Sequence, residues 1–167
     1  YQHNGQKYSV LISLGYYNEL GVQLTQGFER VSSQFALDYR GTKSFRWGLS
    51  FNAALNHQDW GADVYEIALN QNPLALPYDD AGNILLQPEN HPFRFNPLLS
   101  IDGEIDDRNT KRLLSHVYTE FKLGKALSYR LNLGSDLLSQ QRGVFQEANT
   151  QARRGGFKFA LYDQTRR

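Results

Sequence analysis

The sequence predicts an all-β fold: an antiparallel up-and-down sheet of about six strands, forming a segment of a transmembrane β-barrel with long extracellular loops. Three observations predict it. Apolar and polar residues alternate over long stretches, short and long connections take turns along the chain, and aromatic residues are abundant. The 10 Tyr, 10 Phe and 2 Trp accompany a mean hydropathy of only −0.57. A chain that is polar on average yet rich in aromatic residues suits alternating strands better than a helical bundle.

The first half of the chain contains three expected strands, at residues 8–16, 29–40 and 45–56. The third shows the clearest alternation, because apolar residues occupy every second position and mostly polar or small residues the positions between. The apolar set is Phe45, Trp47, Leu49, Phe51, Ala53 and Leu55, and the intervening set is Arg46, Gly48, Ser50, Asn52, Ala54 and Asn56. Period-two patterning of this kind is the mark of a strand with one apolar and one polar face.

The second half contains three more expected strands, at residues 113–121, 128–137 and 156–162. In a barrel, the polar faces of all six strands would point into the lumen. There they would tune selectivity or contact an internal domain. The candidates for this role are Arg46, Asn52, Asn56, Arg130 and Asn132.

The connections divide into two kinds. Tight turns are expected at residues 41–44 and 123–127, where Gly41 and Gly124 supply a permissive backbone. Long connections are expected at 18–28, 58–110 and 138–155, all at the opposite end of the sheet. Outer-membrane barrels have short periplasmic turns and long extracellular loops, so this asymmetry favours the barrel. A soluble β-sandwich, a much commoner fold whose strands also alternate, stays open as the alternative.

The connection 58–110 is too long for an ordinary loop, which indicates a function. A short helix is expected over residues 63–70, with Asp63 as N-cap and Glu66 three residues later. Aromatic and arginine side chains of this loop could stack on or bind a ligand, or pack the loop on itself or on a partner. These candidate binding residues are Trp60, Tyr65, Tyr78, Phe93, Arg94 and Phe95.

Composition excludes several function classes. The formal charge of +1 gives no basic footprint for nucleic acid, and the absence of cysteine removes thiolate metal sites and cysteine nucleophiles. The acidic residues Asp102, Glu104, Asp106 and Asp107 suit a solvated loop better than a calcium site. Likewise His57, with Asp59 and Asp63 nearby, suits a polar strand end better than a metal site. We therefore expect no metal, no cofactor and no enzyme, and a secreted glycosidase fragment is the least favoured reading.

Six strands are too few for a barrel of this type, whose smallest members have about 8. An open sheet in lipid would leave unpaired backbone groups at its edges. Residues 1–167 are therefore expected to be part of one barrel domain, completed by further polypeptide and surrounded by outer-membrane lipid. The missing initiator Met and signal segment also suggest that the chain was processed or cut from a longer one.

A series of short motifs resembles the SusC/RagA-type TonB-dependent outer-membrane transporters. The resemblance covers roughly residues 5–167, and it depends on the order and spacing of the motifs more than on any one of them. The most specific are Asn72-Pro73, Tyr78-Asp79-x-x-Gly82-Asn83 and Asn96-Pro97-Leu98. The others are Tyr8-Ser9-Val10, Gly15-Tyr16-Tyr17 with Glu19-Leu20-Gly21, Phe28-Glu29-Arg30, Tyr118-x-Glu120 and Leu127-x-Tyr129-Arg130.

This resemblance implies a barrel of about 22 strands with an N-terminal plug, located in the outer membrane of a Gram-negative bacterium of Bacteroidetes type. It implies import of glycans or peptides, energised by TonB and assisted by a SusD-like surface lipoprotein. The plug domain and the TonB-contacting segment have no counterpart in these residues. The rival hypothesis from another class is a soluble β-sandwich that binds carbohydrate.

Overall fold

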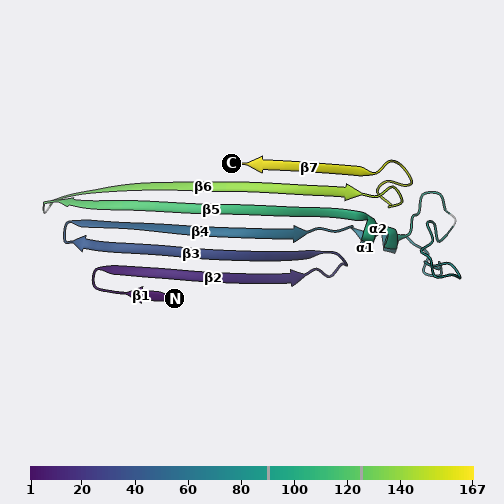
Figure 1. Cartoon of the computed structure of the whole chain (residues 1–167), viewed down its shortest axis with the longest axis horizontal. Helices are drawn as coiled ribbons and strands as arrows, with labels where there is room; N and C mark the ends of the chain where they lie inside the picture. Colours follow the sequence, from purple (N-terminus) through teal and green to yellow (C-terminus); the bar gives the residue numbers. More distant parts are fainter. Residues whose placement is uncertain (90, 125) are drawn as a thin grey trace.

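The computed structural model describes residues 1–89, 91–124 and 126–167, and these residues form one open antiparallel sheet flanked at one end by loops (Figure 1). The sheet has seven strands within this described part, in the sequence order β1 to β7. Each strand pairs with the next one along the chain, so the topology is an up-and-down meander. The all-β, antiparallel prediction is thus confirmed, with one strand more than expected.

The strands are long, and two of them reach 20 residues. Their bounds are β1 Gln2–Asn4, β2 Tyr8–Leu20, β3 Gly27–Thr42, β4 Phe45–Asp59, β5 Glu104–Leu123, β6 Leu127–Gln146 and β7 Phe159–Arg166. Two short helices, α1 Val64–Leu69 and α2 Pro97–Gly103, lie in the connection between β4 and β5. No described helix has the length and apolar character needed to cross a membrane.

The expected separation of turns and loops is confirmed. Figure 1 shows the β1–β2, β3–β4 and β5–β6 connections at one end of the sheet and the β2–β3, β4–β5 and β6–β7 connections at the other. The expected long loop at 18–28 is wrong, however. Backbone pairing continues through it, with Asn18 opposite Glu29 and Leu20 opposite Gly27, which leaves only residues 21–26 as a loop.

The sequence-based limits of β5 and β6 are also too short. Pairing between these strands extends to Glu104 opposite Gln146, well beyond the last apolar positions near Leu113 and Leu137. Polar residues occupy both faces of this extension, so the alternation that reveals a strand is absent although the hydrogen-bond ladder continues. Of the acidic residues expected in a loop, Glu104, Asp106 and Asp107 therefore begin a strand, and Asp102 lies in α2.

The helix expected at residues 63–70 is present as α1, but its expected cap is not. Asp63 is the N-cap residue and makes no side-chain capping hydrogen bond. The reverse holds at α2, which the sequence did not predict as a helix. There Pro97 occupies the first turn, and the Asn96 side chain accepts a hydrogen bond from Leu98 N at 3.1 Å.

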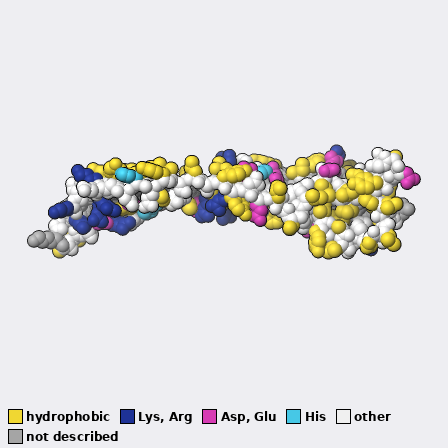
Figure 2. All heavy atoms as spheres, turned by 90° about the horizontal axis from the view of Figure 1, so that it is seen from below, with side chains coloured by type: hydrophobic (Ala, Val, Ile, Leu, Met, Phe, Trp, Pro, Cys, Tyr) yellow, Lys and Arg dark blue, Asp and Glu magenta, His cyan; other side chains and the backbone are white. Residues whose placement is uncertain are grey.

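The register gives the sheet two different faces. One cross-strand row runs through Val10, Leu37, Leu49, Val117 and Leu133, and the two neighbouring rows on that face are apolar apart from Ser115, Ser135 and Thr119. The opposite face carries the row Asp38, Gly48, Tyr118 and Asn132. In Figure 2, hydrophobic atoms line one face of the thin slab and clusters of Lys and Arg lie on the other.

A group of side chains fastens four strands together on the polar face. Tyr118 of β5 lies across Gly48 of β4 and donates a hydrogen bond from its hydroxyl to the Asp38 carboxylate on β3. A Cβ atom at Gly48 would collide with both partners, so the glycine makes room for the ring. Arg130 of β6 covers the ring, with its guanidinium carbon 4.5 Å from the centroid.

Candidate functional site

The residues with side chains hidden from solvent gather in the loops at the far end of the sheet rather than in the sheet. Segments 60–103 and 147–158 pack against each other there, and we call this unit the loop cap. Its interior contains Ala62, Phe95, Asn96, Ser100 and Thr150, each at most 3% exposed. The described side chains that are almost fully buried all belong to this cap, so its geometry depends on contacts within the chain.

Asn96 organises the centre of the loop cap. Its Nδ2 donates to the carbonyl oxygens of Pro77 and Leu85, at 2.8 and 2.9 Å, and its Oδ1 caps α2. Its backbone N–H donates to Leu86 O at 3.0 Å. A buried amide with all its groups satisfied fixes one conformation of the surrounding loop. The Asn96-Pro97-Leu98 motif is therefore structural.

Gln151 joins the two segments of the cap. Its side chain accepts a hydrogen bond from Phe95 N at 2.9 Å and donates one to Phe93 O at 3.1 Å. Within the first segment, Gln71 Nε2 donates to Phe95 O at 3.0 Å. Gln151 thereby holds residues more than fifty positions apart in contact, which no local pattern in the sequence could have shown.

The six predicted binding residues fall into two groups. Tyr65 and Phe93 are each 62% exposed, while Trp60 and Tyr78 are about half exposed. Trp60 stands at the base of the cap, where the guanidinium carbon of Arg108 is 5.1 Å from its ring centroid. Phe95, at 3% exposed, instead packs the interior of the loop, which is the other role the sequence left open.

Arg94 is the predicted binding residue that also lines a pocket. This pocket has a volume of about 320 Å³ and lies between α1, the segment 91–95 and the second loop. Glutamate, amide and guanidinium groups dominate its wall, which could bind ligands carrying many hydroxyl or charged groups. Its lining residues are Glu66, Ile67, Asn70, Gln71, Arg94, Gln151 and Arg154.

The charge of Arg94 is already matched within the chain. Its Nη1 lies 2.9 Å from Glu89 Oε2, and Glu89 also accepts a hydrogen bond from Asn72 N. The hydrogen bond from Asn72 N–H lowers the pKa of Glu89 below its ordinary value, and the guanidinium of Arg94 lowers it further by a smaller amount. Near neutral pH, Arg94 is therefore a paired arginine, and Arg154 is the other guanidinium of the pocket.

The Tyr78-Asp79-x-x-Gly82-Asn83 motif forms a tight turn at the edge of the cap. Asp79 Oδ1 accepts hydrogen bonds from Ala81 N and Asn83 N, at 3.0 and 2.8 Å, and Asn83 Nδ2 donates to Asp79 Oδ2 at 3.0 Å. Gly82 has the positive φ of 86° that the turn requires. These donors, above all the Asn83 side chain, lower the pKa of Asp79.

The residues considered for metal binding are dispersed. Asp106 forms a two-point ion pair with Arg142, at 2.6 and 2.9 Å, whereas Asp107 is on the opposite face of β5. His57 Nδ1 meets Asn109 Oδ1 at 2.9 Å, and its Nε2 is 3.3 Å from Asp59. Within the described ranges, no group of three His, Cys, Asp or Glu residues is arranged to hold a metal ion.

No protein-family model matches the chain, and no curated protein matches it either.

Proposed function

We propose that this chain is part of the wall of a β-barrel in the outer membrane of a Gram-negative bacterium. The observation that carries the proposal is an apolar band on one face of the sheet. On β4 the band runs from Phe45 to Leu55, about 33 Å along the strand. With the roughly 40° tilt of barrel strands, this gives a height of about 25 Å, the height of the apolar band on such barrels.

The side chains in this band support a lipid environment because no element of the described chain packs over them. Leu14, Leu133 and Leu137 are all more than half exposed although they lie on the apolar face. Aromatic side chains form the border of the band next to the short turns, as interfacial girdles do. They include Tyr8, Tyr39, Trp47, Phe121 and Tyr129.

The edges of the sheet call for additional strands in lipid. Only a short β1 covers part of β2, and β7 pairs with the sheet on one side. Unpaired edges are costly in hydrocarbon, so the proposed barrel is closed by further strands. The loop cap then lies on the extracellular side, because long loops face outward in such barrels.

The transported material follows from the motif resemblance to SusC/RagA-type importers. On that basis, the whole barrel would import glycans or peptides with a plug, TonB and a SusD-like lipoprotein as partners. The chain itself would supply wall and loop cap, with no catalytic step. The rival proposal, a soluble β-sandwich that binds carbohydrate, would require a second sheet against the apolar band.

Single-cysteine labelling would test the membrane orientation directly, because these 167 residues contain no cysteine and any cysteine elsewhere in the full protein can be replaced by serine. The full protein, purified in its membrane, would carry an environment-sensitive fluorophore at Leu133→Cys or, as the matched control, at the neighbouring Asn132→Cys. We expect brominated lipids to quench the first label strongly and the second weakly. Equal quenching at both positions would rule out the membrane barrel.

Import requires a separate experiment in cells. We expect growth on the transported oligomer to be lost when the gene for this protein is deleted and also when TonB is inactivated. Growth that needs the protein but not TonB would leave the barrel intact and contradict the TonB-dependent class.

A further inference from the structure

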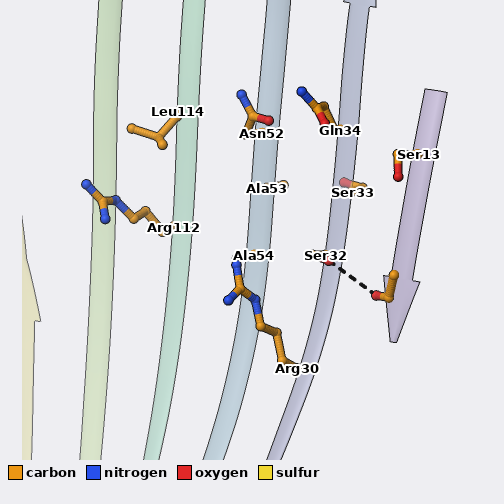
Figure 3. Close-up of a pocket in the computed structure, with 11 residues that line it drawn as sticks. Ser13, Arg30, Ser32, Ser33, Gln34, Asn52, Ala53, Ala54, Arg112 and Leu114 are labelled. Carbon is orange, nitrogen blue, oxygen red and sulfur yellow. Dashed lines mark hydrogen bonds between the residues drawn. The ribbon is translucent and has the colours of Figure 1, made fainter. Parts of the chain in front are cut away.

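A shallow hollow lies in the middle of the polar face, away from the loop cap. It spans β2 to β5 and has a volume of about 330 Å³. Its floor is the cross-strand row of Gly15, Ser32 and Ala54, whose side chains are too small to fill the space. The lining residues are Ser13, Gly15, Arg30, Ser32, Ser33, Gln34, Asn52, Ala53, Ala54, Arg112 and Leu114 (Figure 3).

Two arginines border this hollow, and they differ in whether an acidic side chain pairs with them. Arg112 is paired with Asp136, through Nε at 3.0 Å and Nη2 at 2.7 Å. Arg30 has no ion-pair partner among the described residues. Figure 3 shows its side chain reaching from β3 to a position beside Ala54, so its guanidinium lies at the rim of the hollow. The hollow therefore has one uncompensated positive charge.

Neutral polar groups complete the wall. Among the residues drawn in Figure 3, the one marked hydrogen bond joins Ser32 Oγ to Gly15 O at 3.5 Å. The hydroxyl of Ser13 and the amides of Gln34 and Asn52 are thus available for a ligand. Leu114 is the one large apolar side chain in the lining, so the wall is suited to hydroxyl groups more than to hydrocarbon.

We propose that this hollow binds a carboxylate-bearing sugar, a uronate unit of an acidic oligosaccharide. Arg30 pairs with the carboxylate, since guanidinium and carboxylate form two parallel hydrogen bonds. The serine and amide groups bind the ring hydroxyls. A volume at the lower end of the usual range for ligand pockets, about 300–1,000 Å³, suits one sugar ring. The inference rests on the proposed function only in that the polar face then lines the import route.

Direct binding to the full protein, purified in detergent, would test the site. The probes are tetragalacturonate, its methyl ester, which has the same rings without charge, and a tetraglutamate peptide. We expect tetragalacturonate to bind at least about tenfold more tightly than the ester or the peptide, and to bind more weakly at high salt. We expect Arg30→Gln to remove most of this preference, with a loss of about tenfold or more.

Arg40→Gln is the matched control, because it removes one positive charge from the same face of the same strand near the distant turn. It should leave binding within about twofold of the unmodified protein. Absence of tetragalacturonate binding at millimolar concentration, equal binding of the ester or the peptide, or equal effects of the two substitutions would overturn the site. Cysteine labelling reports on the membrane independently, so failure of either proposal can be recognised without the other.

Discussion

The sheet and the loop cap achieve order in opposite ways. In the sheet, an extensive backbone ladder positions side chains such as Leu133 and Leu137, which remain more than half exposed on the apolar face. In the cap, there is little regular structure, yet Asn96 and Ser100 are fully buried and hydrogen-bonded. The difference teaches that the cap is stabilised mainly by contacts within itself, whereas the apolar face of the sheet is left exposed by the described residues.

The largest effect should come from placing a charge on the apolar face. We expect Phe51→Arg, near the middle of the band, to cost about 2–4 kcal/mol of stability in the membrane. Ser50→Arg, one residue away on the polar face, should change it by no more than about 0.5 kcal/mol. Urea titration of the protein in lipid vesicles, followed by electrophoretic mobility without heating, measures both. Equal losses would show that the two faces do not differ in their surroundings.

The second-largest effect should come from breaking hydrogen bonds inside the loop cap. Asn96→Ala removes the side-chain donor of the Leu85 carbonyl and one of the two donors of the Pro77 carbonyl, which keeps Leu85 N, and it removes the cap of α2, for a loss of roughly 2–3 kcal/mol. Hydrogen exchange should speed up in peptides from the cap and stay unchanged in β3 and β4.

Asn70→Ala is the control for the cap, because the side chain of this exposed asparagine at the end of α1 makes one hydrogen bond among the described residues, from Nδ2 to Glu66 O at 2.9 Å. We expect a change within about 0.5 kcal/mol. Faster exchange throughout the sheet in Asn96→Ala would mean that cap and sheet unfold together, and the contrast between them would then be lost.

A smaller effect should follow from the polar face of the sheet itself. Tyr118→Phe removes the hydroxyl that donates to Asp38 across Gly48, and we expect a loss of about 1 kcal/mol. Tyr129→Phe on the apolar face is the matched control and should be closer to neutral. Equilibrium unfolding of both variants measures the difference. A larger loss of stability in Tyr129→Phe would indicate that the hydrogen bond between Tyr118 and Asp38 contributes little.

The smallest effect concerns pH at the edge of the cap. The pKa of Asp79 is lowered chiefly by the Asn83 side chain, so this turn gains stability above the ordinary aspartate pKa of about 3.9 and loses it as pH falls through the lowered value. Asn83→Ala should raise the pKa of Asp79 toward the ordinary range. Carbon-13 NMR titration of the carboxylate measures this, with Asn72→Ala as a control that leaves it in place.

The contrast between the two regions also explains what could be predicted from sequence. Alternation reveals β4 because one of its faces is apolar from Phe45 to Leu55. It misses the extension of β5 from Glu104, where both faces are polar and only backbone pairing defines the strand. Alternation in the sequence therefore predicts where the apolar band lies, and it does not predict where each strand begins and ends.

The contacts of the loop cap are harder to predict from sequence than the strands. Its residues were singled out by chemical type, and Arg94 does line a pocket, but the partners that form that pocket come from distant segments. Gln151 is hydrogen-bonded to Phe95, 56 positions away, and neither residue belongs to a periodic pattern from which this contact could be predicted. Phe95 looked like a binding aromatic because its burial depends on the second loop. The hollow around Arg30 was missed because it is formed by small side chains on adjacent strands.

The extension of β5 and β6 also has a mechanical consequence. From Leu113 to Glu104, β5 continues about 30 Å past the apolar band while still paired with β6. In the proposed orientation, this extension, which β4 also pairs with as far as Asp107, is a stiff connection between the barrel wall and the loop cap. A change of about 5° in strand tilt would move the cap sideways by roughly 2–3 Å over that length. Small distortions of the wall would thus be amplified at the pocket between α1 and the second loop.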